Sequence, residues 1–88
     1  MNVRWRSMTE AEIYQQLTPL FRETFDNDEI ALTPQLSAAD VEEWDSLSNI
    51  RLIVAAERQF GVRFSTSEIS SFQNVGDFVG SISAKLGN

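Results

Sequence analysis

The segment VEEWDSLSNIRLIVAAERQFGVRF, residues 41–64, passes from an acidic run to an apolar one at Ser46. Beyond Ser46, apolar residues recur at the spacing of an amphipathic helix, which predicts a helix over about 46–60. Gly61 follows at the position where a left-handed residue commonly ends a helix. The predicted apolar face is wider than half of the helix and comprises Leu47, Ile50, Ile53, Val54, Ala56 and Phe60.

Upstream, Thr9 and Glu12 match the T-x-x-E capping box, which marks the start of a helix. Apolar residues at helical spacing then predict a helix over about 9–25. Pro19 lies inside this range, where a proline removes a backbone hydrogen bond. We therefore expect either a kink at Pro19 or a helix that restarts with Thr18 as its cap. The predicted core residues of this helix are Ile13, Leu17, Leu20, Phe21 and Phe25.

Residues 26–45 have no clear period and form a long predicted loop. Loops of this length are uncommon in compact domains, where they are usually functional or disordered. Scattered apolar residues indicate that this loop is anchored to the core, with a possible short helical turn near 37–41. The predicted anchors are Ile30, Leu32, Leu36 and Val41.

Two further capping patterns follow Gly61. Ser65 with Glu68 predicts a short third helix, and Asn74 with Asp77 predicts a last helix over about 75–86. No stretch has the pattern of a strand. The sequence thus predicts an all-α fold, a four-helix bundle with a long loop after the first helix and a short third helix.

Eighty-eight residues make one small domain. We expect a flexible N-terminal leader at 1–8, where the sequence is basic, and a folded domain at 9–88. No apolar run approaches the ~20 residues needed to cross a bilayer. The chain is therefore predicted to be cytoplasmic and not to insert into a membrane.

Composition and charge exclude several classes of function. The chain has no Cys and no His, which removes Cys nucleophiles, imidazole bases and the usual zinc ligands. We predict no metal site and no enzymatic activity, because the chain is also short for a deep pocket. The net charge of −6 argues against a nucleic-acid partner. Most of this charge precedes Ser46: residues 8–45 hold ten acidic residues and one basic residue, whereas residues 46–88 hold three and four.

Two interpretations of Ser46 follow from its position. Either Asp45 or Ser46 could cap the helix by accepting hydrogen bonds from free backbone N–H groups. Alternatively Ser46 is a modification site, because the N–H groups and the dipole at a helix N-terminus favour a phosphate group. No His or Lys lies near Ser46 in the sequence to activate its hydroxyl. A modification of Ser46 would therefore require a separate enzyme.

The segment EEWDSLSNIRLIVAAERQFGVRFSTSEI, residues 42–69, resembles the attachment region of acyl carrier proteins, whose hallmark is Asp-Ser-Leu at the start of helix two. Residues 26–44 and the segment NVGDFVGSI, residues 74–82, are similar to the first loop and the last helix of that family. The resemblance implies that Ser46 receives 4′-phosphopantetheine from coenzyme A through a magnesium-dependent phosphopantetheinyl transferase. The thiol of that group would carry an acyl chain as a thioester. Asp45 would flank the attachment site and help the transferase to bind.

The resemblance also implies roles for residues around Ser46. Leu47 and Ile50 would form an apolar patch on which the transferase and other partners dock, with Arg51 beside it. A cleft between helices two, three and four would shelter the cargo. Its candidate lining residues are Val54, Ile69 and Phe72, for which a place in the ordinary core is the alternative.

The chain departs from the family pattern in charge. Typical carriers of fatty acid synthesis have several carboxylates along helix two, which bind Arg and Lys of their partners, whereas Arg51 and Arg58 stand here. These arginines either set specificity or form a solvated face. The resemblance indicates a free-standing, specialised carrier for a fatty-acid-like or secondary-metabolite pathway, monomeric and loaded by its own ligase or transferase. Alternatives are an aminoacyl carrier loaded by an adenylating ligase and a non-covalent helical adaptor.

Overall fold

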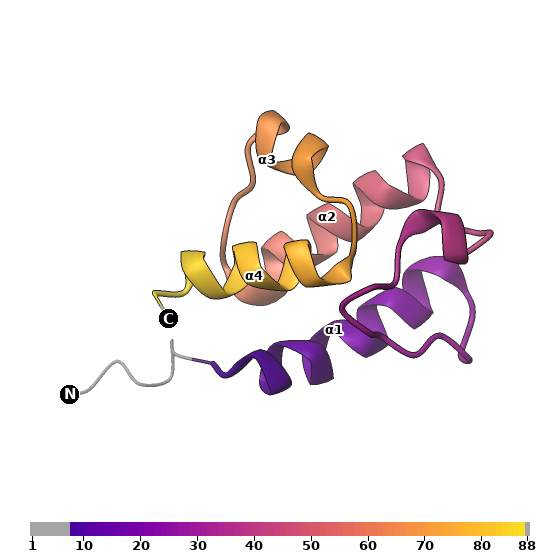
Figure 1. The fold of residues 1–88 in the computed structure, drawn as a ribbon, viewed down its shortest axis with the longest axis horizontal. Helices are drawn as coiled ribbons and strands as arrows, with labels where there is room; N and C mark the ends of the chain where they lie inside the picture. The colour runs from indigo at the N-terminus through magenta and orange to yellow at the C-terminus, as the bar shows by residue number, and fades with distance from the viewer. Residues whose placement is uncertain (1–7, 88) are drawn as a thin grey trace.

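The computed structural model describes residues 8–87. Its elements are α1 (Glu10–Phe25), the 3-10 turn η2 (Ala38–Asp40), α2 (Ser46–Phe60), α3 (Thr66–Ser71) and α4 (Val75–Lys85). Helix α1 packs against α2 and α4, and the short α3 lies on the side of these two helices that is remote from α1 (Figure 1). The predicted all-α fold with four helices is confirmed. Within the described range, no helix is both long and apolar enough to cross a membrane.

The leader that we predict at 1–8 falls outside the described residues except for Met8. Met8 is half-buried and packs against the hydrophobic core. The boundary between leader and domain stays a prediction.

Helix α1 begins with the predicted capping box. Thr9 Oγ1 accepts a hydrogen bond from the Glu12 N–H at 3.1 Å, and Glu12 Oε1 accepts one from the Thr9 N–H at 2.8 Å. The helix is continuous through Pro19, so a restart at Thr18 is wrong. The Thr18 hydroxyl instead donates to the Tyr14 carbonyl at 2.8 Å, a bond that threonine often makes inside a helix.

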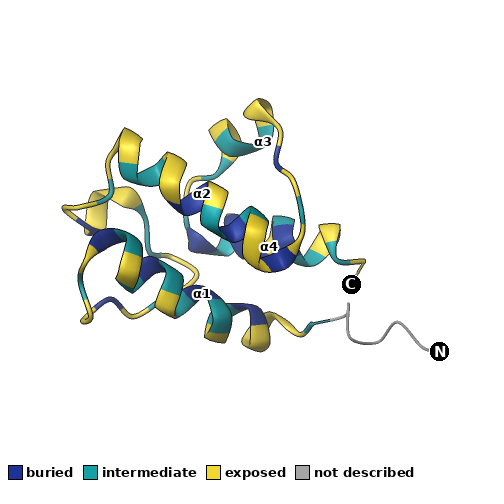
Figure 2. Cartoon of the chain, turned by 180° about the vertical axis from the view of Figure 1, so that it is seen from behind, coloured by how far each residue is buried: buried dark blue, intermediate teal, exposed yellow. Residues whose placement is uncertain are grey.

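The face of α2 that enters the core differs from the predicted face. Three of the predicted residues are exposed: Leu47 by 59%, Ile50 by 60% and Val54 by 40%. The apolar stripe of α2 is wider than its contact with α1, and periodicity does not show which edge of a wide stripe is covered. In Figure 2 the buried segments of α2 and α4 turn toward α1. The buried residues of α2 are Leu52, Ile53, Ala56 and Phe60.

The long loop between α1 and α2 is fastened to the start of α4. The Val75 N–H donates to the Leu36 carbonyl at 2.9 Å, and the Gly76 N–H donates to the Pro34 carbonyl at 3.0 Å. A Cβ atom on Gly76 would lie 3.1 Å from that carbonyl oxygen, so the loop would have to move by a few tenths of an ångström to admit a side chain there. The predicted anchors Ile30 and Val41 are buried, and η2 occupies the predicted helical turn.

Two aromatic clusters stand at either side of α2. Trp44 packs against Phe21 and Phe25, with ring centroids 5.4 Å and 5.6 Å away. The second cluster lies by α3 and consists of Phe64, Phe72 and Phe78. The first cluster fixes the chain immediately before α2, and the second fixes the position of α3 against α4.

Candidate functional site

Asp45 is the residue that caps α2. Its backbone is extended, and its Oδ1 accepts a hydrogen bond from the Ser48 N–H at 2.9 Å. This hydrogen bond lowers the pKa of the Asp45 carboxyl below its ordinary value. The carboxylate is thus ionised at neutral pH, and its charge is favourable at the positive end of the helix.

Ser46 does not cap α2, because Asp45 is the N-cap. It is the first residue of α2, and it is exposed. None of the described residues forms a hydrogen bond with its hydroxyl. A hydroxyl that is exposed and unpaired can be reached by a second macromolecule, which a place in the packed interior would have prevented.

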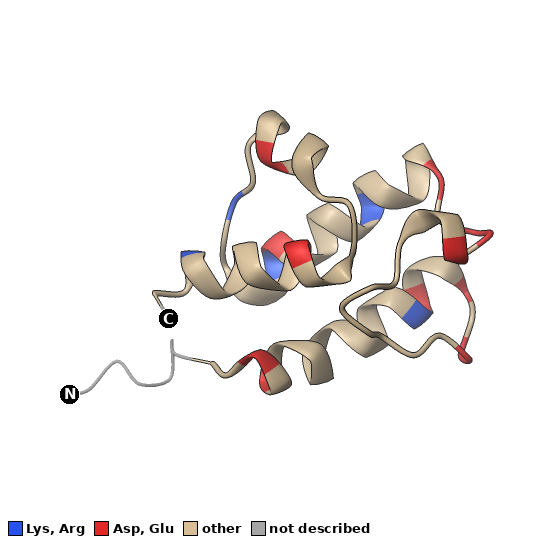
Figure 3. Ribbon diagram, viewed as in Figure 1, with Lys and Arg blue, Asp and Glu red and all other residues tan. Residues whose placement is uncertain are grey.

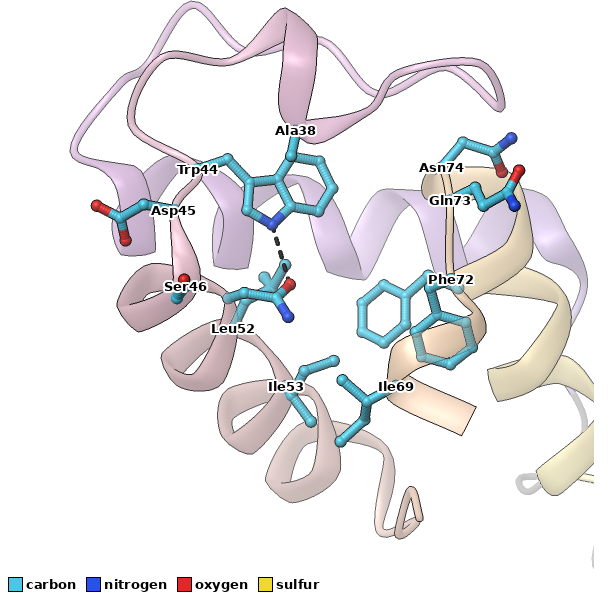
Figure 4. Close-up of a pocket in the computed structure, with 12 residues that line it drawn as sticks. Ala38, Trp44, Asp45, Ser46, Leu52, Ile53, Ile69, Phe72, Gln73 and Asn74 are labelled. Carbon is cyan, nitrogen blue, oxygen red and sulfur yellow. Dashed lines mark hydrogen bonds between the residues drawn. The ribbon is translucent and has the colours of Figure 1, made fainter. Parts of the chain in front are cut away.

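Ser46 lies on the rim of a cleft of about 400 Å³. One wall of the cleft comes from α2, and the opposite wall comes from α3 and the segment that leads into α4 (Figure 4). At the rim, the indole N–H of Trp44 donates to Asn49 Oδ1 at 3.0 Å. The lining residues are Ala38, Trp44, Asp45, Ser46, Asn49, Leu52, Ile53, Ile69, Phe72, Gln73, Asn74 and Phe78.

The structure places two of the three predicted cleft residues in the cleft. Ile69 and Phe72 line it from α3 and the end of that helix, opposite Ile53 (Figure 4). Val54 does not line it and lies 40% exposed beside a separate hollow near the end of α2. At about 100° per residue, Ile53 is only about 20° from Ser46 around the helix axis, whereas Val54 is about 80° away on the other side.

Sequence reasoning missed several residues of the cleft. Asn49 and Ile53 follow Ser46 by three and seven positions, so helical spacing alone puts them on its side of the helix. That signal could have found both residues. Trp44 and Phe78 reach the cleft from other segments, and only the tertiary fold brings them there.

The three residues predicted to meet partner proteins are all exposed. Leu47 and Ile50 are among the most exposed large apolar side chains of the described chain, and Arg51 is also exposed. They lie within the first two turns of α2, beside Ser46. The structure therefore brings these residues together with Ser46 and keeps them out of the core.

Residues 15–82 match the family model described as the phosphopantetheine attachment site. The chain belongs to the acyl carrier protein family. The carrier is 33% identical to an acyl carrier protein of Acidothermus cellulolyticus over 73 residues, which cover 83% of this chain and 87% of the relative. It is 29% identical to acyl carrier protein 2 of Ralstonia nicotianae over 79 residues, which cover 90% and 98%.

A solved structure agrees with these relatives. The carrier superimposes on the solution structure of a holo acyl carrier protein from Geobacter metallireducens with a TM-score of 0.80 and 42% identity. The match covers 84% of this chain and 85% of that one. The family works with a phosphopantetheinyl transferase and with acyl-handling enzymes, and 4′-phosphopantetheine is its prosthetic group.

The residues of this carrier suit that group. Attachment requires a hydroxyl that a transferase can reach, and the Ser46 hydroxyl is exposed and unpaired within the described chain. The beginning of α2 favours the negative charge of a phosphodiester. The adjoining cleft has both apolar and amide side chains around it, which match the amide-containing arm and its cargo.

Proposed function

We propose that Ser46 holds the 4′-phosphopantetheine arm and that the carrier delivers acyl groups, bound to the arm as thioesters, in a specialised pathway. The supporting observation is that only one of two adjacent residues, Asp45, caps the helix. Asp45 supplies the helix cap, which leaves an exposed and unpaired hydroxyl on Ser46.

The attachment that we infer is a transfer from coenzyme A. The Ser46 oxygen bonds to the phosphorus next to the pantetheine arm, the bond from that phosphorus to the nucleotide portion breaks, and adenosine 3′,5′-bisphosphate leaves. Asp45 is a weak base, since its pKa is lowered by the Ser48 hydrogen bond. The proton of the Ser46 hydroxyl therefore passes to a base of the transferase.

The surroundings of Ser46 have separate roles in this proposal. Leu47, Ile50 and Arg51 contact the transferase and later partners, because all three are exposed beside the attachment residue. Ile69 and Phe72 shelter the cargo in the cleft next to the arm. Val54 belongs with the contact surface, since it lies outside the cleft.

Two features bear on the pathway and the cargo. Arg51 and Arg58 are exposed on α2, and a partner with a basic docking surface would repel them. This charge favours a dedicated carrier, loaded by its own ligase or transferase. An aminoacyl cargo delivered by an adenylating ligase is the alternative, because the loading enzyme determines the cargo.

Intact-mass analysis after incubation with coenzyme A and a promiscuous phosphopantetheinyl transferase tests the attachment. We expect the wild-type chain to gain the mass of one phosphopantetheine and Ser46→Ala to gain none. Ser48→Ala is the matched control, because it removes a hydroxyl from the same helical turn and should still be modified. If the wild-type chain gains no mass, the protein is a non-covalent adaptor; modification of Ser46→Ala would place the arm elsewhere.

A further inference from the structure

One side of α2 combines exposed apolar side chains with arginines. Leu47, Ile50 and Val54 are 59%, 60% and 40% exposed. At about 100° per residue, these three residues, Arg51 and Arg58 fall within an arc of about 100° around the helix. All five residues are exposed, and we refer to them as the α2 ridge. A contiguous exposed apolar patch of this kind marks an interaction surface.

The ridge ends in a hollow. An open depression of about 490 Å³ follows Val54, and Arg58 and Arg63 both line it. Gly61, which has a left-handed backbone, turns the chain here and brings Arg63 next to the end of the helix. A partner side chain that enters the hollow therefore meets two guanidinium groups.

The arginines of this surface are not neutralised within the chain. Among residues 8–87, the ion pair that forms is between Lys85 of α4 and Glu68 of α3, and it includes none of these arginines. Glu57 also lines the hollow; one of its carboxylate oxygens accepts the Phe64 N–H at 2.9 Å, and its negative charge remains. With Arg58 and Arg63 the lining of the hollow still has a net positive charge, which is available to a partner together with Arg51.

The opposite end of α2 has the opposite charge. Glu42, Glu43 and Asp45 precede Ser46 and are all exposed. Figure 3 shows acidic residues gathered where the long loop meets the start of α2, with basic residues along α2 and beyond its end. The charge of this surface therefore changes along α2, from negative near Ser46 to positive toward Arg63.

We propose that the α2 ridge docks on an acyl-handling enzyme whose contact surface holds an apolar hollow for Leu47 and Ile50 and carboxylates that face Arg51, Arg58 and Arg63. The identity of the partner class rests on the proposed function. The arm is attached at Ser46, at the start of α2, and enters the active site of the partner from there. The carboxylates that face Arg58 and Arg63, near the other end of the helix, therefore lie away from the entrance of that active site. Charge complementarity of this kind fixes the orientation of the complex and excludes partners with a basic surface at that position.

Two synthetic helical peptides test the charge preference. Both have the same leucine stripe, and the flanking positions are Glu in one peptide and Lys in the other. Their binding to the ¹⁵N-labelled carrier is followed by amide chemical shifts. We expect the Glu peptide to shift amides of residues 47–63 and the Lys peptide to shift amides of the acidic segment before Ser46.

Charge reversal measures the contribution of the arginines. In the triple variant Arg51→Glu, Arg58→Glu, Arg63→Glu, the Kd for the Glu peptide should rise about ten-fold, because each exposed ion pair changes affinity a few-fold. The matched variant Arg51→Lys, Arg58→Lys, Arg63→Lys keeps the charge and should bind the Glu peptide within about two-fold of wild type, because exposed ion pairs contribute little beyond their charge. Dispersed amide spectra establish that each variant is folded.

The outcomes separate the two proposals. Binding of the Lys peptide to residues 47–63 as tightly as the Glu peptide, no shift by the Glu peptide, or an unchanged Kd after charge reversal would each overturn the docking proposal. These measurements use the chain before attachment of the arm, so they stand whether or not Ser46 is modified. Failure of the proposed function is seen instead as an unchanged intact mass after incubation with the transferase.

Discussion

The two sides of α2 carry the same kinds of side chain and use them differently. Leu52 is 1% exposed and Leu47 is 59% exposed, although both are leucines of one helix. Leu52, Ile53 and Ala56 lie on one side of Ser46 around the helix axis, and the α2 ridge lies on the other. Ser46 thus stands at the boundary between a surface that stabilises the fold and a surface that remains open to partners.

The largest expected effect separates these two surfaces directly. Leu52→Ala should lower the free energy of unfolding by about 2–5 kcal/mol, because it empties a filled core position. Leu47→Ala, the matched change on the ridge, should alter it by no more than about 0.5 kcal/mol. Denaturant unfolding measures both values. Equal losses in the two variants would show that the ridge is part of the core.

The rate of modification, unlike stability, should depend on Leu47. Leu47→Ala should slow modification by the transferase, because its side chain is exposed beside Ser46, while its stability is retained. The measurement is the initial rate of phosphopantetheine transfer to the folded protein. A wild-type rate for Leu47→Ala would remove this residue from the contact surface.

Two glycines of α4 also differ in their contact with the rest of the fold, and their replacement by alanine should change stability less than Leu52→Ala does. A Cβ on Gly76 would lie 3.1 Å from the Pro34 carbonyl oxygen, whereas nothing lies within 4 Å of a Cβ on Gly80. Gly80→Ala should stabilise the protein by about 0.8 kcal/mol through helix propensity. Gly76→Ala should destabilise it by about 1 kcal/mol, because the loop must shift and its hydrogen bonds to α4 weaken. Thermal unfolding of both variants checks the opposite signs.

The smallest effect distinguishes Asp45 from Ser46. Asp45→Ala should lower Tm by a few degrees because it removes the cap, while Ser46→Ala should leave Tm unchanged. The pKa of Asp45 is lowered in the folded state. Its contribution to stability is therefore present above the ordinary carboxyl pKa and is lost as pH falls through the folded value.

Asp45→Asn isolates this titration, since asparagine caps helices about as well and does not ionise. Between neutral and acidic pH, Tm of Asp45→Asn should fall less steeply than Tm of the wild-type protein. Parallel curves for the two proteins would show that the capping carboxylate is not responsible for acid sensitivity.

The helix starts and ends could be predicted from the sequence, because each depends on a few neighbouring residues. The capping boxes at Thr9 and Ser65, the stop at Gly61 and the cap at Asn74 each involve a few adjacent positions, and all four occur in the structure. The all-α fold follows from them. The pattern also pointed to Ser46 as a modification site, although the choice of Asp45 as the cap needed the observed hydrogen bond.

Tertiary contacts decided what the sequence left open. Leu52 was missed and Val54 was put in the cleft, because the orientation of α2 depends on where α1 covers it. The Trp44 contacts with Phe21 and Phe25 join segments that are about twenty residues apart. One expectation for Pro19, a restart of the helix at Thr18, was wrong, because α1 is one helix from Glu10 to Phe25 with buried residues on both sides of the proline. The other expectation, a kink, stays a prediction.

The hydrogen bond from Ser48 to Asp45 has a consequence for the life cycle of the carrier. Esterification of the adjacent Ser46 oxygen, as proposed above, would break no bond of the scaffold, because the helix start depends on the aspartate. We therefore expect the unmodified and modified forms to share one architecture and the transferase to act on an already folded substrate. Each round of loading and unloading would then require no refolding of the protein.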